Sequence, residues 1–106
     1  MNNHAAATIH CSVEQAGKLP PPITATTVCD AIGKAALPAL ERAAMPPAAL
    51  SVTVRVESDR KIVAAATLHG KPLPEHRIGI SDRALNAHAV DMLAAAIAAD
   101  IASARQ

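Results

Sequence analysis

Histidine and cysteine are the residues of this chain that could bind a metal or attack a substrate. The five histidines are scattered, and no two have the i, i+4 spacing of a helical zinc site. Two of them flank a turn at residues 70–75, but a metal bound there lacks further ligands. We therefore predict no metal and no other cofactor. The histidines are His4, His10, His69, His76 and His88.

Cys11 and Cys29 are the two cysteines, and neither belongs to a C-x-x-C motif. Two cysteines in a domain of this size do not make a disulfide framework, so we predict two free thiols and no disulfide between them. Cys29 falls near the start of a predicted helix, where a thiol is reactive if a base lies beside it. His10 is the one base we can suggest, and we favour an inert thiol. No residue is predicted to be catalytic.

Basic residues concentrate between residues 55 and 83. The stretch holds six bases and four acids, a difference of 6 − 4 = +2, and the whole chain carries only +1. Nucleic-acid binders usually show a basic excess, and single-strand binders stack bases on aromatic rings, which this chain lacks. A nucleic-acid-associated regulator is therefore the alternative function. Its contact residues are Arg55, Arg60, Lys61, Lys71, Arg77 and Arg83.

Alternation of apolar and polar residues predicts the strands that must position these groups. The clearest case is 50–57, where Leu, Val, Val and Val alternate with polar residues, as in a half-buried antiparallel strand. Residues 60–69 are expected to return as a hairpin partner after a two-residue turn at Ser58 and Asp59. Residues 8–14 and 76–80 are predicted as shorter strands.

Two helices complete the predicted fold. Thr27 and Asp30 have the spacing of a capping box for the first helix, and Pro38 is expected to kink or split it. Ser81 is predicted to cap a second helix over 82–104.

The predicted order is β-α-β-β-β-α, in one domain spanning residues 1–106. Residues 1–7 are expected to be a loose start, and 15–23 a proline-rich linker inside the domain. We predict an α+β two-layer sandwich: two helices on one face of a three- or four-stranded, mainly antiparallel sheet.

The run 79–85, followed by an alanine-rich helix, is similar to the entry into the last helix of double-stranded-RNA-binding domains. The α-β-β-β-α order of 27–104 also resembles that family. However, the family has a lysine pair where this chain has Asp82 and Arg83. It also reaches a minor groove with the loop between its first two strands, for which a turn of two residues is too short. The resemblance is one of element order.

Strand 60–69 predicts where a partner binds. Its apolar residues fall on both faces, and an apolar row on both faces means that both are covered. The helices cover one face, and either residues 8–23 or a second subunit covers the other. We favour the second subunit, because two-fold dimers are the commonest soluble oligomers. The predicted homodimer interface is Val63, Ala65 and Thr67.

Composition sets the class of protein that we expect. Alanine fills 26 of 106 positions, and charged residues are only 18%, as in a chain whose surface lies partly against a partner. No apolar run reaches the ~18 residues of a membrane helix, and residues 1–10 lack the pattern of a signal segment. We expect a cytoplasmic, non-enzymatic homo-oligomeric interaction or assembly protein, with room for a further protein partner and with neither membrane nor nucleic acid as one. A small enzyme with a site between subunits is the least favoured alternative.

Overall fold

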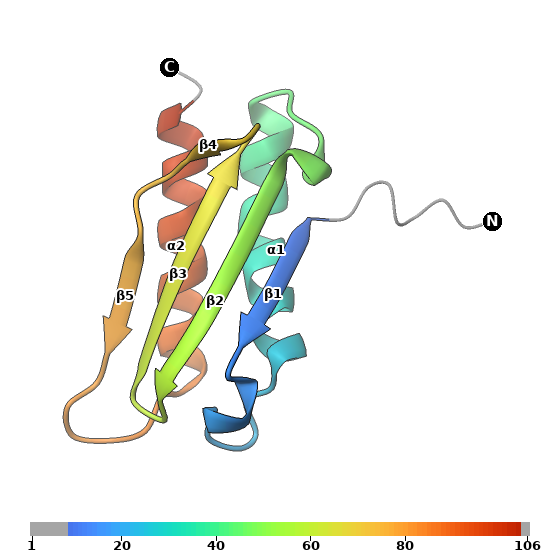
Figure 1. Cartoon of the computed structure of the whole chain (residues 1–106). Coiled ribbons are helices and arrows are strands. Elements are labelled where there is room, and N and C mark those ends of the chain that lie inside the picture. Colours follow the sequence, from blue (N-terminus) through green and yellow to red (C-terminus); the bar gives the residue numbers. More distant parts are fainter. Residues whose placement is uncertain (1–8, 105–106) are drawn as a thin grey trace.

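Strands and helices alternate along residues 9–104, the part of the chain that the computed structural model describes (Figure 1). The predicted loose segment 1–7 lies outside these residues. The helices are α1 (Ala25–Arg42) and α2 (Ala87–Ala104), with short 3-10 turns η2 (Ala16–Lys18) and η3 (Pro47–Ala49). The strands are β1 (His10–Glu14), β2 (Leu50–Ser58), β3 (Lys61–Leu68), β4 (Lys71–Pro72) and β5 (His76–Gly79).

The five strands form one mixed sheet with both helices on the same face (Figure 1). β2 and β3 pair antiparallel, and β4 and β5 both pair antiparallel with β3 on its other side. β1 instead pairs parallel with β2, because α1 carries the chain back along the sheet before β2 begins. The predicted α+β two-layer fold is confirmed, with one strand more than expected and a parallel pair at one edge.

The core lies between the sheet and the helices. The apolar row of β2 fills its centre, and each of the four side chains in that row is at most 1% exposed. Residues 9–23 also contribute to this core: Ile9 and Val13 pack against it, and Leu19 and Ile23 are buried in it. The N-terminal segment therefore does not cover the other face of the sheet. The buried row of β2 is Leu50, Val52, Val54 and Val56.

Helix α1 begins three residues before the predicted capping box. Thr24 and Thr27 cap it reciprocally, because the backbone N–H of each donates to the side-chain oxygen of the other at 3.2 Å. Pro38 lies inside α1 and does not divide it, so of the two expected outcomes, a kink or a split, the split is wrong. Its exposed ring faces solvent, while buried Ala36 and Leu40 pack the turns on either side of it into the core. Tertiary packing of this kind outweighs local helix preference.

Helix α2 begins later than predicted, so the Ser81 cap is wrong. The side chain of Asn86 accepts the backbone N–H of Ala89 at 3.0 Å and caps the helix instead. The preceding loop binds the β2–β3 turn: Arg60 donates to the Ser81 carbonyl at 3.0 Å, and the turn accepts the N–H of Leu85. These bonds anchor the loop to the β2–β3 turn without a helix.

By length and composition α2 could cross a membrane, with a mean hydropathy of 1.3, and it is the single such helix within residues 9–104. Its apolar side chains nevertheless fill the core, and α2 packs alongside α1 and the sheet. Core helices of soluble proteins pass the same composition test. The buried side chains of α2 include Val90, Leu93, Ile97 and Ile101.

Candidate interaction surface

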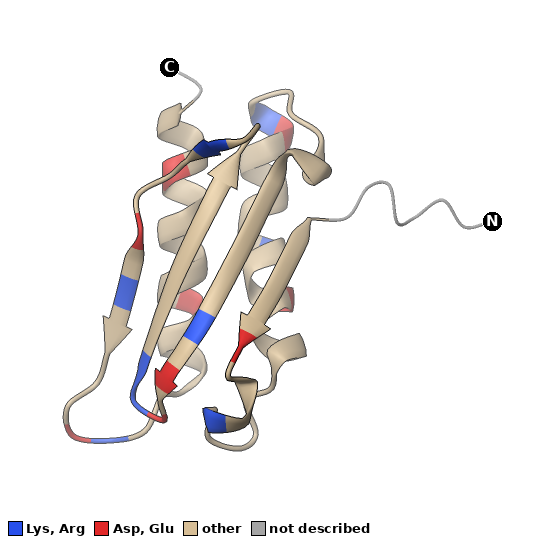
Figure 2. Cartoon of the chain, in the orientation of Figure 1, with Lys and Arg blue, Asp and Glu red and all other residues tan. Residues whose placement is uncertain are grey.

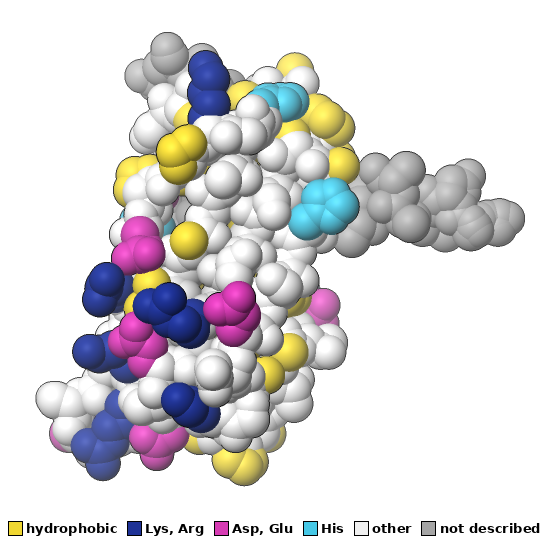
Figure 3. All heavy atoms as spheres, viewed as in Figure 1, with side chains coloured by type: hydrophobic (Ala, Val, Ile, Leu, Met, Phe, Trp, Pro, Cys, Tyr) yellow, Lys and Arg dark blue, Asp and Glu magenta, His cyan; other side chains and the backbone are white. Residues whose placement is uncertain are grey.

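The face of the sheet that points away from the helices, here the outer face, divides into two halves. One half, the neutral half, carries small side chains that are side by side in the strand register. The other, the charged half, carries acids and bases together, and Figure 3 shows them gathered over one end of this face. The neutral half is Ser12, Ser51, Thr53, Ala65 and Thr67; the charged half is Glu14, Arg55, Glu57, Lys61, Glu75 and Arg77.

The three predicted interface residues all lie on the outer face of β3, but they differ in exposure. Ala65 is exposed and Thr67 is half-buried. Val63 is only 3% exposed, and its direct cross-strand neighbours are Arg55 on β2 and Arg77 on β5. Arginine stems cover neighbouring apolar surface. Val63 is therefore covered by its own chain and does not itself require a second subunit.

Ion pairs neutralise much of the charged half. Arg55 Nη2 lies 2.9 Å from Glu57 Oε2, and Lys61 Nζ lies 3.9 Å from Glu57 Oε1. The hydrogen bond from Arg55 is the main cause that lowers the pKa of Glu57, and the same bond raises the pKa of Arg55. Arg77 pairs with Glu75 at 3.1 Å. Exposed pairs of this kind contribute little stability, but they fix where the charges lie.

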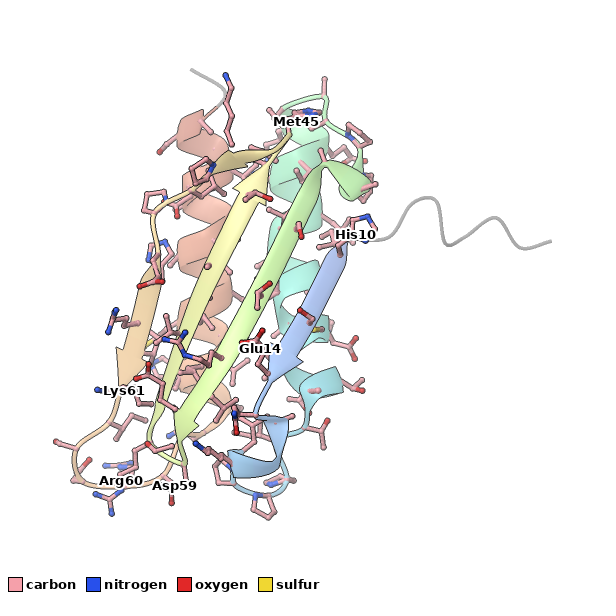
Figure 4. The ribbon with its side chains drawn as sticks, in the orientation of Figure 1. His10, Glu14, Met45, Asp59, Arg60 and Lys61 are labelled. Atoms are coloured by element: carbon pink, nitrogen blue, oxygen red, sulfur yellow. A yellow bond between two sulfur atoms is a disulfide. The ribbon has the colours of Figure 1, made fainter. Side chains whose placement is uncertain are left out.

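The remaining bases of the predicted nucleic-acid cluster lie around the same end of the sheet, with one exception. Arg60 and Lys61 stand at the β2–β3 turn (Figure 4), and Arg83 pairs with Asp82 at 3.6 Å. Lys71 is on β4 at the opposite end of the molecule (Figure 2). The structure therefore brings five of the six bases to one end and interleaves them with acids.

Cys11 and Cys29 form a disulfide between β1 and α1, with their Cα atoms 5.9 Å apart. The prediction of two free thiols is wrong, and Cys29 has no thiol to serve as a nucleophile. Cys11 belongs to the inward row of β1, and Cys29 follows the buried Val28 on the helix that covers this strand. The sequence signal was a cysteine in the inward row of a strand followed by another early in the next helix.

His76 and Asp100 form a second link between the layers. His76 Nε2 on β5 lies 2.5 Å from Asp100 Oδ2 on α2, and the two side chains are 27% and 19% exposed. His69 instead lies exposed in the β3–β4 turn, with φ 52°. Residues 9–104 bring together no group of three side chains that could hold a metal. The sequence did not predict the His76–Asp100 contact, because the two residues are 24 positions apart and lie on different elements.

Comparison with known proteins found no matching family model, no matching curated protein and no matching solved structure. The arguments for function therefore come from the geometry of this chain. Its most distinctive surface is the outer face, because both helices lie on the other side of the sheet (Figure 1).

Proposed function

We propose that this chain is a small non-enzymatic interaction protein that acts through its surface and binds first to a second copy of itself. The observation that supports the proposal is the neutral half of the outer face. Sheets that face each other pack about 10 Å apart. Ala65 and its neighbour Thr53 are small enough to allow such an approach.

Ala65 is exposed, and within residues 9–104 no strand beyond β3 pairs with it. β5 ends its pairing with β3 at Ala64, and β4 begins pairing at Thr67, so neither strand pairs with Ala65. Its strand neighbour on the other side is Thr53, followed by Ser12 of β1. Ala65, Thr53 and Ser12 therefore present no long side chain to a partner sheet.

The charged half favours a second copy over a strongly charged partner. It holds three acids and three bases among the residues named above. When the charged halves of two copies face each other, each meets equal numbers of acids and bases. The acids of one copy can then lie against the bases of the other. Electrostatic complementarity of this sort sets specificity more than affinity.

The test is the mass of the protein in solution at tens of micromolar. We expect light scattering to give at least twice the chain mass, and Ala65→Arg, which places a long cation in the neutral half, to lower it. Ala95→Arg, at an exposed alanine of α2, is the matched control and should keep the larger mass. A mass that Ala65→Arg leaves unchanged contradicts the outer face as the contact.

The disulfide bears on location. Disulfides persist in oxidising compartments and are rare in the cytosol. We therefore propose an oxidising compartment for this chain in place of the cytoplasm expected from the sequence. The test is to quench the cells with acid and alkylate free thiols before any reductant is added. Cys11 and Cys29 should then remain unmodified, because the disulfide protects both sulfur atoms. Two alkylated thiols in that sample contradict the proposal.

A further inference from the structure

Strand β1 lies at an open edge of the sheet. Within residues 9–104 it pairs with β2 on one side and with no strand on the other (Figure 1). Such an edge presents unpaired backbone N–H and C=O groups, and proteins usually protect it with proline, lysine or a bulge. β1, with the sequence HCSVE, has neither proline nor lysine. The opposite side of the sheet has Pro72 and Pro74 before a four-residue β5.

The outward side chains of β1 complement a second copy of themselves. His10 and Glu14 stand at the two ends of the strand on the outer face, and both are exposed (Figure 4). Neither forms an ion pair within residues 9–104, although Glu14 stands opposite Arg55 of β2 in the strand register and interacts with it electrostatically. If two copies of β1 pair antiparallel about Ser12, His10 of each copy lies opposite Glu14 of the other. A histidine ring N–H can donate to a carboxylate in either protonation state.

This register is the one that places His10 and Glu14 opposite each other at both ends of the seam. A shift by two residues leaves Glu14 or His10 beyond the end of the partner strand, and a shift by one turns each side chain toward the wrong face. On the inner side, the centred register places Cys11 opposite Val13, two half-buried residues of the apolar row. The positions of His10 and Glu14 therefore favour antiparallel pairing of the two β1 strands, centred on Ser12.

A groove beside the strand provides further contact area. It measures about 600 Å³, and its walls include Ile9, Gly33, Leu37 and the disulfide. Leu37 on α1 is 43% exposed. A two-fold axis through Ser12 brings the two α1 helices toward each other, because each lies over its own edge strand. Leu37 lies eight residues beyond Cys29 on α1, toward the Ile9 end of the groove, so the axis places the two Leu37 side chains at opposite ends of the seam.

The disulfide holds this edge ready for pairing. It joins Cys11, next to Ser12, to α1, so the edge strand is fixed on its helix before a partner arrives. An edge that is already ordered loses less conformational entropy on binding.

We propose that β1 is a self-association edge, at which two copies join antiparallel about Ser12 and form one continuous sheet. The outer faces of both copies then lie on the same side of that sheet, and their neutral halves join into one larger surface. This contact is separate from the outer-face contact proposed above and does not depend on it.

Charge changes at β1 test the proposal, because they act on exposed side chains that the fold does not need. His10→Glu opposes two acids at each end of the seam and should weaken association about tenfold, seen as a fall in mass at fixed concentration. His10→Lys should strengthen association. His88→Glu, an equal charge change at an exposed residue of α2, is the matched control and should leave the mass unchanged.

A mixing experiment fixes the register. Both variants are made in the Ala65→Arg background, which removes the outer-face contact. There the His10→Glu variant and the double variant His10→Lys/Glu14→Lys should each be monomeric, because like charges face each other across the seam. An equimolar mixture should form a heterodimer, since each end then pairs an acid with a lysine. A mixture that keeps the monomer mass, or a His10→Glu variant with the wild-type mass, overturns the proposal.

The two proposed contacts are distinguished by the same measurement. If Ala65→Arg lowers the mass and His10→Glu does not, the outer-face contact stands and the β1 edge is excluded. If His10→Glu lowers the mass and Ala65→Arg does not, the β1 edge stands and the outer-face contact is excluded.

Discussion

The strands β1 and β5, on opposite sides of the β2–β3 pair, are each tied to the helix layer, but by different bonds. The Cys11–Cys29 disulfide joins β1 to α1, and the His76–Asp100 pair joins β5 to α2. Both strands are short, at five and four residues, and within residues 9–104 each pairs with one neighbouring strand. A strand with one neighbour has half the ladder hydrogen bonds of a central strand, so a link to the helix adds stability where the sheet supplies least.

The comparison shows that two edge strands of one sheet can be attached to the helices by different kinds of bond, a disulfide at β1 and a histidine–carboxylate contact at β5. A disulfide constrains the unfolded chain and is lost only to a reductant. A half-buried histidine–carboxylate contact depends on hydrogen bonding and charge in the folded state. The β1 edge should therefore respond to redox conditions, and the β5 edge should not.

The largest expected effect tests the core that the two edges share. Val54 is fully buried at the centre of β2, between Val13 of β1 and Ala64 of β3. Val54→Asp places an unpaired charge there and should cost several kcal/mol, about the whole stability of a marginal domain. Thermal denaturation followed by circular dichroism should find the variant unfolded. A midpoint within a few degrees of the wild type contradicts the assigned core.

The next effect breaks the β1 link. The double substitution Cys11→Ser/Cys29→Ser removes a bond that spans 18 residues of sequence and should lower the free energy of unfolding by about 2–4 kcal/mol. Amide hydrogen exchange should lose protection in β1 more than in β5, because only the first edge loses its link. Equal losses at both edges, or none, argue against a local role for the disulfide.

A smaller effect breaks the β5 link. His76→Ala leaves Asp100 half-buried without its partner and should cost about 1–2 kcal/mol. The matched pair of single variants, His76→Ala and Asp100→Ala, combined in a double variant, measures the coupling between the two side chains in chemical denaturation. If the two single effects simply add, the contact does not stabilise β5.

The smallest expected change in stability is at the charged half of the outer face, which takes no part in the Cys11–Cys29 or His76–Asp100 contacts. Glu57→Gln removes the exposed pair with Arg55 and should change stability less than either link variant. Because the folded pKa of Glu57 is lowered, its contribution is present above its unfolded pKa and is lost as the pH falls through the folded value. Wild type and variant should therefore converge in acid, and a difference that grows below pH 4 contradicts this reading.

The sequence predicts the strands better than it predicts the helix ends or the links. The alternation in β2 locates its buried row correctly, because one face of a sheet must exclude water at every second residue. Helix starts depend on which of several nearby polar residues acts as the cap: Thr24 instead of Thr27, and Asn86 instead of Ser81. Tertiary contacts decide that choice, and the sequence does not show them.

The contacts between layers were the least predictable feature. The Cys11–Cys29 bond needs β1 to lie under α1, and the His76–Asp100 contact needs β5 to lie beside α2. The direction of β1 was equally hidden, because a strand of alternating residues reads the same whether its neighbour is parallel or antiparallel. The burial of Val63 was also hidden: the sequence shows an apolar residue on the outer face, but not the two arginines of the same chain that flank it.

The disulfide also makes the protein optically simple. The chain has no tryptophan, tyrosine or phenylalanine, so the Cys11–Cys29 bond is its one near-ultraviolet chromophore. Near-ultraviolet circular dichroism, which ordinarily averages over many aromatic rings in a folded core, here reports the handedness and surroundings of a single bond between β1 and α1. A spectroscopist can therefore follow this one junction, without a label, while far-ultraviolet signals follow the rest of the fold.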